Sequence, residues 1–179
     1  SKVEERFVAH DELFPNVPKM CMEMWDGWFD AWGDEKHHTT SAEEYAKTVD
    51  DMLKRGNLNI YMFIGGTNFG FTSGANHYET YAPDVTSYDY DALLSECGDV
   101  TPKYTAIRNV IQKYTAESLP AVPKNREKRA YGRVAASAKA ELFRNLNALS
   151  RAVSTEVPKC MEEYGFGYGN FFLRYLPFV

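Results

Sequence analysis

Apolar residues recur with two different periods in the first two thirds of the chain. Helical spacing predicts helices over residues 1–13, 41–55 and 101–114. Unbroken apolar runs predict strands over residues 19–25 and 58–64, and such runs are typical of parallel strands that are covered on both faces. The order strand, helix, strand therefore predicts a βαβ unit in a parallel sheet.

Capping residues mark the ends of two of these helices. Ser41 and Glu44 form a capping-box pattern at the start of one helix, and Gly56 is predicted to be its C-cap. Thr101 precedes Pro102, an arrangement that suits the N-cap and the first position of the next helix. Both helices are thus predicted to start at side chains that satisfy free backbone amides.

Two other segments divide the chain. Residues 67–99 are rich in glycine and aromatic side chains and too long for a simple connection, which predicts a functional loop. Proline and charged residues over 119–130 indicate a linker. We therefore predict a first domain over residues 1–118 and a second domain over residues 131–179.

The second domain carries weaker signals. Strands are predicted over residues 131–140 and 170–175, and a short helix over residues 141–149. So few elements cannot close a sandwich or a barrel. We therefore expect only the beginning of a β-rich domain.

Composition and charge exclude several classes of protein. Hydrophobic residues make up 44% and aromatic residues 15% of the chain, as in a soluble globular protein. The net charge of -5 predicts no nucleic-acid partner, and no apolar run has the length of a membrane span. Cys21, Cys97 and Cys160 form no CxxC pattern, which predicts free thiols and favours a reducing, cytoplasmic location.

Glu23 is the candidate for chemistry because it interrupts the apolar run over residues 19–25. A salt-bridged structural carboxylate is the alternative interpretation. Aromatic residues follow it at once, and their flat apolar faces suit stacking against sugar rings, as a glycosidase requires. These aromatic residues are Trp25, Trp28 and Trp32.

Three segments carry a resemblance to a known family. They are MEMWDGWFDAWG at 22–33, NIYMFIGGTNFG at 59–70 and TSYDYD at 86–91. In this order they resemble the β-galactosidases of glycoside hydrolase family 35. The resemblance implies an α/β fold, namely the C-terminal portion of a (β/α)8 TIM barrel followed by the beginning of a β-sandwich domain. The predicted strands 19–25 and 58–64 would then be the seventh and eighth strands of the barrel.

The same resemblance implies which residues form the site. Glu23 would be the nucleophile of a retaining enzyme that removes terminal β-linked galactose from a β-galactoside substrate. Tyr61 and Tyr90 would bind the sugar, and Trp25 would form a wall of the site. No cofactor and no metal are expected, since the adjacent residues His37 and His38 lack the ligand spacing of a zinc site.

One part of the family's site has no counterpart here. The resemblance implies an acid/base glutamate in an Asn-Glu motif on the fourth strand, and the sequence contains no Asn-Glu pair. The chain is therefore predicted to carry the nucleophile half of the site, with the N-terminal part of the barrel as its partner. The alternative is a catalytically silent fragment that acts as a folding or assembly module or as a weak carbohydrate-binding piece.

Overall fold

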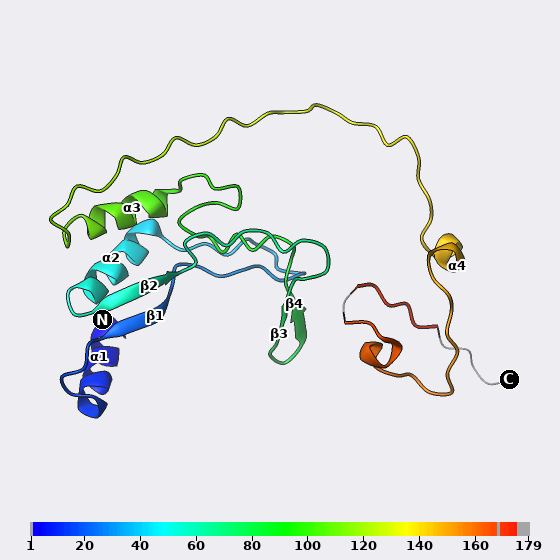
Figure 1. Cartoon of the computed structure of the whole chain (residues 1–179), viewed down its shortest axis with the longest axis horizontal. Coiled ribbons are helices and arrows are strands. Elements are labelled where there is room, and N and C mark those ends of the chain that lie inside the picture. The colour runs from blue at the N-terminus through cyan, green and yellow to red at the C-terminus, as the bar shows by residue number, and fades with distance from the viewer. Residues whose placement is uncertain (1, 168, 175–179) are drawn as a thin grey trace. The chain divides into compact units, whose positions relative to one another are not determined.

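The computed structural model describes residues 2–167 and 169–174 and divides the chain into two compact units, 1–126 and 127–179. The first unit is mixed α/β. Its centre is a parallel pair of strands, β1 (Met20–Trp25) and β2 (Asn57–Tyr61), joined by helix α2 (Ala42–Leu53). The predicted βαβ unit is therefore confirmed (Figure 1).

Helix α2 begins as predicted and ends differently. The Ser41 hydroxyl accepts a hydrogen bond from the Glu44 amide at 3.3 Å, which satisfies one free amide of the first turn. The C-cap is Lys54, so the prediction of Gly56 as the C-cap is wrong. Gly56 instead lies against the backbone of Lys19, where a Cβ atom would come within 2.9 Å of the Lys19 carbonyl oxygen. A close approach of two chain segments, not the helix end, requires glycine there.

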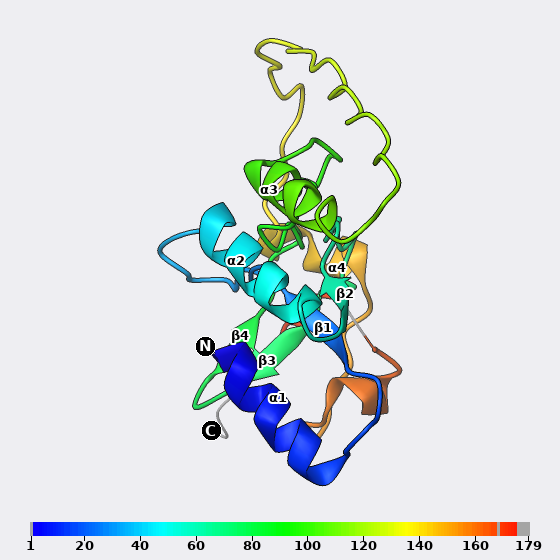
Figure 2. The same cartoon turned by 90° about the vertical axis from the view of Figure 1, so that its left-hand side faces the viewer.

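Helix α3 (Pro102–Ile111) packs beside α2 (Figure 2). The Thr101 hydroxyl accepts from the Tyr104 amide at 3.3 Å, which confirms the predicted N-cap. Both helices contribute to one core with the strands and the segment before α3. Its buried residues are Met24, Tyr45, Val49, Leu93, Ile107 and Val110.

The β1–β2 pair is covered on one face only, which corrects the prediction of two covered faces. Met24 packs into the core with Ile60 alongside it. On the strands' other face Met22 is 64% exposed and Trp25 54% exposed. The apolar pattern was a correct sign of a strand, but within the described residues α2 and α3 supply a cover for one side alone.

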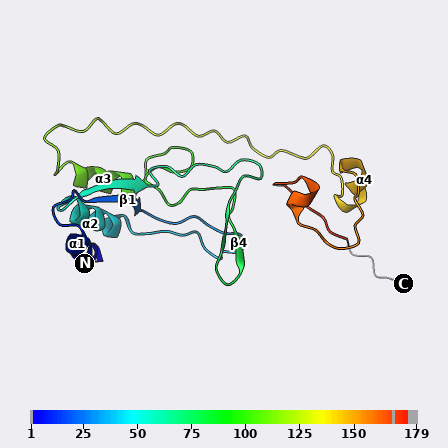
Figure 3. The same cartoon turned by 60° about the horizontal axis from the view of Figure 1, so that its bottom comes forward.

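The predicted strand 58–64 stops early. β2 ends at Tyr61, because the amide of the next residue, Met62, donates to the Asp26 carboxylate at 3.0 Å and not to a neighbouring strand. The long loop that follows contains a hairpin that the sequence did not predict, β3 (Ala75–His77) with β4 (Tyr81–Pro83). Figure 3 shows this hairpin at the end of the loop region away from α2.

Helix α1 (Lys2–Leu13) confirms the prediction for the first residues. Its Phe7 is buried. The ammonium group of Lys19, next to the start of β1, forms a salt bridge with the Asp11 carboxylate at 2.6 Å. Among the described helices, none has both the length and the apolar character that crossing a membrane demands.

The second unit contains short helical turns, η1 (Phe143–Asn145), α4 (Leu146–Leu149) and η2 (Met161–Tyr164). The first two confirm the predicted helix within 141–149. The strands predicted over 131–140 and 170–174 are wrong, since the structure places no strand there; residue 175 lies outside the described residues. These segments have no partner strand, and side chains such as Tyr131 and Val134 remain exposed.

Candidate active site

Glu23 lies on the open face near the end of β1, where the strand is irregular. The register shifts between Cys21 and Met24, so that Met22 and Glu23 together face Asn59 of β2. An extra residue of this kind turns a side chain away from the regular alternation of a strand. The Asn59 side-chain amide donates to the Met22 carbonyl at 3.1 Å, which holds the bulge in place.

Trp25 fixes the carboxylate of Glu23. The indole Nε1–H of Trp25 donates to Oε2 of Glu23 at 3.1 Å. Both residues are exposed. An exposed carboxylate whose position is fixed by a hydrogen bond is suited to act as a nucleophile.

An aromatic cluster continues from Trp25 and joins the predicted site residues. Trp25 contacts Trp28 edge-on at 5.3 Å between ring centroids, and Trp28 lies 6.1 Å from Tyr90. Tyr90 contacts Tyr61 edge-on at 5.4 Å. We call this set the aromatic wall, and its members are Trp25, Trp28, Phe29, Tyr61, Tyr88 and Tyr90.

The structure thus brings Glu23, Trp25, Tyr61 and Tyr90 together from three separate segments. Trp32 lies outside the wall and is exposed. Three segments can meet here because β1 and β2 end side by side and the loop after Thr86 returns to them, with Gly65 so close to Tyr88 that a Cβ atom would lie 1.5 Å from its carbonyl oxygen.

Two tyrosines of the wall remain neutral phenols. Burial raises the pKa of Tyr90 well above its usual value, and the nearby groups Tyr61, Asp26 and Glu23 raise it further. Burial and the hydrogen bond with Tyr61 raise the pKa of Tyr88 in the same direction. The hydroxyls of Tyr61 and Tyr88 lie 3.2 Å apart. Neutral phenols both donate and accept, which suits recognition of sugar hydroxyls.

Sequence reasoning missed a buried polar network behind the wall. Lys103, the only charged side chain besides Asp26 among the buried described residues, is 4% exposed. Its ammonium group donates to the carbonyl of Asp26 and to the carbonyl of Asp91, each at 2.7 Å, and pairs with the Asp91 carboxylate. A lysine in the first turn of a helix is normally exposed, so the sequence offered no signal for this role.

Asp26 is the second residue that was missed. The residue is 1% exposed, and Oδ2 of its carboxyl group has no hydrogen-bond partner among the described residues. Burial raises the pKa of Asp26 to about 6, although the Met62 amide and the charge of Lys103 act in the opposite direction. The one available signal was its position directly after an apolar strand.

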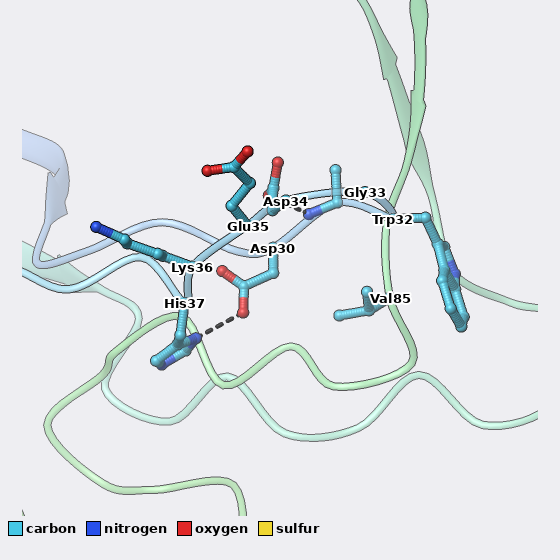
Figure 4. Close-up of a pocket in the computed structure, with 9 residues that line it drawn as sticks. Asp30, Trp32, Gly33, Asp34, Glu35, Lys36, His37 and Val85 are labelled. Atoms are coloured by element: carbon cyan, nitrogen blue, oxygen red, sulfur yellow. Dashed lines mark hydrogen bonds and ion pairs between the residues drawn. The ribbon is translucent and has the colours of Figure 1, made fainter.

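A separate carboxylate–imidazole cluster lies in the loop before α2. Asp30 accepts from His37 Nδ1 at 2.5 Å and from the His38 amide at 2.9 Å. Asp30 and His37 line a hollow of about 250 Å³. Figure 4 shows the contact between their side chains. Burial opposes ionisation of Asp30, but the hydrogen bonds from both histidines together lower its pKa to about 2.

Part of this cluster has the donor set of a divalent-cation site. One ligand atom from each of Asp30, Asp34 and His38 lies within 4.8 Å of the others. Two carboxylates and an imidazole suit Zn²⁺ or Mn²⁺. The histidines already bond to Asp30, however, so the cluster is satisfied without an ion.

Comparison with known proteins identifies the family of the chain. The family model "Glycosyl hydrolases family 35" matches residues 1–114. The chain is 42% identical to human "Beta-galactosidase-1-like protein 3" over 86% of this chain and 23% of that protein. It is 39% identical to "Beta-galactosidase" of Xanthomonas manihotis over 93% of this chain and 28% of that enzyme. It is 47% identical to "Beta-galactosidase" of Bos taurus over 72% of this chain and 19% of that protein.

The chain belongs to glycoside hydrolase family 35. It spans about a quarter of the length of three curated relatives that it matches. The resemblance seen in the sequence is thereby confirmed at the level of the family.

Proposed function

We propose that this chain supplies the nucleophile half of a retaining β-galactosidase site, with Glu23 as the nucleophile. The observation that carries the proposal is the arrangement of Glu23 at the end of a parallel strand, with its carboxylate held by Trp25 at 3.1 Å and bordered by the aromatic wall. Catalytic groups of (β/α)8 barrels lie at this end of the strands. Membership of family 35 supports the same assignment.

The reaction would proceed in two displacements. A carboxylate oxygen of Glu23 attacks the anomeric carbon as the bond from this carbon to the leaving oxygen breaks, and an acid protonates that oxygen. Water then cleaves the galactosyl ester. The residue that served as the acid, now a base, takes a proton from this water. We propose that Tyr61 and Tyr90 hold sugar hydroxyls during both steps, and their edge-on contact at 5.4 Å within the wall supports a joint role.

The acid/base carboxyl group would come from another part of the enzyme. We assign β1 and β2 to the seventh and eighth strands of a (β/α)8 barrel, and their open face to contact with the barrel's other strands. The exposed apolar side chains on that face, such as Met22, support this partner because they are costly to leave in water. A silent assembly module is the alternative, in which the same face is covered but Glu23 performs no chemistry.

The nucleophile can be tested without the acid. A 2,4-dinitrophenyl 2-deoxy-2-fluoro-β-galactoside carries a leaving group that departs unprotonated, and its fluorine slows hydrolysis of the ester. We expect the chain, alone or within the full-length enzyme, to gain one fluorogalactosyl group on the peptide that contains Glu23, as mass spectrometry would detect. The Glu35→Gln variant, which alters an exposed carboxylate in the neighbouring loop, should label normally.

The full-length enzyme gives a second test. Glu23→Ala should abolish turnover of a chromogenic β-galactoside, and azide should restore part of it by attacking the anomeric carbon in place of the carboxylate. Normal activity in Glu23→Ala would exclude the assignment. Labelling of a different carboxylate would move the nucleophile to that residue, and an unlabelled chain in an active enzyme would favour the silent module.

A further inference from the structure

Three segments that carry the site converge on one residue behind it. The amide of Asp26 donates to the Tyr61 carbonyl at 3.2 Å, and its Oδ1 accepts from the Met62 amide at 3.0 Å. These two bonds bracket Tyr61 at the end of β2. Asp26 itself follows Trp25 directly, so it joins the end of β1 to the end of β2.

The third segment is attached through Lys103. Its ammonium group bridges the carbonyl of Asp26 and both the carbonyl and carboxylate of Asp91, the residue after Tyr90. The Thr40 hydroxyl donates to the same Asp26 carbonyl at 2.5 Å, while the Thr40 amide donates to Asp91 at 2.7 Å. The contacts around Asp26 therefore reach the backbone on both sides of the site.

We propose that Asp26 is a positioning residue that fixes the places of Glu23 and the two site tyrosines relative to one another. The effect of this positioning on catalysis rests on the proposed function. Asp26 is only 1% exposed, so we assign it a role through the Met62 amide and through the carbonyl that Lys103 holds.

The surroundings of Asp26 make this role dependent on pH. Charged and titratable groups face it from each element packed against it: Lys103 from α3, Asp91 and Tyr90 from the loop, and Tyr45 from α2. Burial raises the pKa of Asp26 to about 6. Its neutral form suits the dry site. Ionisation above that pH leaves a buried charge that water does not solvate, a cost that outweighs the favourable Met62 amide and Lys103 and loosens the three segments.

The test uses the whole chain and two independent readouts over pH 5 to 8. The first is the rate at which the activated fluorogalactoside labels Glu23. The second is the NMR signal of the Trp25 indole N–H, assigned with Trp25→Phe, which reports the contact with Glu23. The variants are Asp26→Asn, which imitates the neutral acid, Asp26→Ala, which removes the acceptor of the Met62 amide, and Asp34→Asn as an exposed control.

In the wild type we expect the rate of labelling to fall about tenfold between pH 5 and pH 8, because small displacements of reacting groups slow a reaction strongly. The indole signal should move with a midpoint near pH 6. Asp26→Asn should remove both transitions. Asp26→Ala should slow labelling at every pH, and circular dichroism should confirm that this variant is folded. Asp34→Asn should resemble the wild type. To separate titration of Glu23 itself, Glu23→Gln should keep the indole transition.

Several results would overturn the proposal. Transitions that persist in Asp26→Asn, or wild-type labelling in Asp26→Ala, would show that Asp26 positions nothing. If the wild type is not labelled at all, the proposed function fails, but the indole transition and its loss in Asp26→Asn still decide the positioning role. Absence of an indole transition in the wild type would contradict that role as well.

Discussion

Two aspartates in the connection between β1 and α2 differ in their exposure to water and in their hydrogen-bond partners. Asp26 is 1% exposed and has one carboxyl oxygen without a partner among the described residues, and burial raises its pKa to about 6. Asp30 is partly exposed and accepts hydrogen bonds from two histidines. Although burial opposes ionisation, these bonds lower its pKa to about 2.

The contrast separates two uses of a carboxyl group. At Asp30 the partners are charged or polar and water is near, so the ionised form is favoured and its interactions are screened. At Asp26 the surroundings are dry, so each remaining contact carries more energy and each lost contact costs more. The segments that carry Glu23, Tyr61 and Tyr90 meet at the dry aspartate, and this predicts large effects there and small effects at Asp30.

Removing the cation of the dry network should give the largest effect. Lys103→Met leaves the carboxylate of Asp91 and the carbonyl of Asp26 without their buried donor. We expect a loss of about 3–5 kcal/mol in the free energy of unfolding, measured by urea denaturation at pH 7. The control is Lys113→Met, which breaks an exposed pair with Asp50 and should cost less than about 1 kcal/mol. Equal losses in both variants would contradict the comparison.

Filling the space between the two sides of the site should rank second. A Cβ atom at Gly27 would lie 2.0 Å from the carbonyl oxygen of Tyr90, so Gly27→Ala must push the Tyr90 segment away from β1. We expect a loss of about 3 kcal/mol, measured by thermal unfolding, as for overpacked sites. Gly167→Ala, at a position with no neighbouring atom within 4 Å, is the matched control and should leave the melting temperature nearly unchanged.

The sequence predicted the frame of the first unit because its signals are local. The apolar runs of β1 and β2, the Ser41 cap and the Thr101 cap all depend on neighbours in the chain. The exposed face of β1 and the absence of strands over residues 131–140 could not be predicted in this way. Both depend on whether another segment lies alongside, which a local pattern does not record.

The site was predicted in part for a similar reason. Glu23, Trp25, Tyr61 and Tyr90 were named from the motifs, and the structure brings them together, but their roles remain predictions. Tyr88, which bonds to Tyr61, and the pair Asp26 and Lys103 were missed. Their function follows from burial and from contacts between residues far apart in the sequence, such as Lys103 with Asp26.

Removing the charge of Asp26 should change the stability of the protein in a way that depends on pH. The folded-state pKa of Asp26, about 6, lies above the ordinary value of an aspartate, so the folded protein holds this proton more tightly than the unfolded chain. The wild type therefore loses stability as pH rises from about 4 through 6. Asp26→Asn should be about 2 kcal/mol more stable than the wild type at pH 8 and nearly equal to it at pH 4. Urea denaturation at both values measures this, and a variant that is less stable at pH 8 would contradict it.

The partly exposed Asp30 should give the smallest effect, and its pair with His37 weakens toward both low and high pH. The hydrogen bond to Asp30 raises the pKa of His37, and this contribution is present below the unfolded histidine pKa and is lost as pH rises through the folded value. The lowered pKa of Asp30 gives a contribution that is present above about pH 4 and is lost as pH falls toward 2. The pair is therefore strongest near pH 5.

Because His37 is 48% exposed at its side chain, screening limits the stabilisation. We expect Asp30→Asn to cost less than about 1 kcal/mol at pH 5 and still less at pH 8, measured by urea denaturation. Glu35→Gln in the same loop is the control and should cost nothing measurable. A loss in Asp30→Asn as large as that in Lys103→Met would mean that the loop before α2 is held by its histidine contacts, and the division between a dry and a wet aspartate would then be wrong.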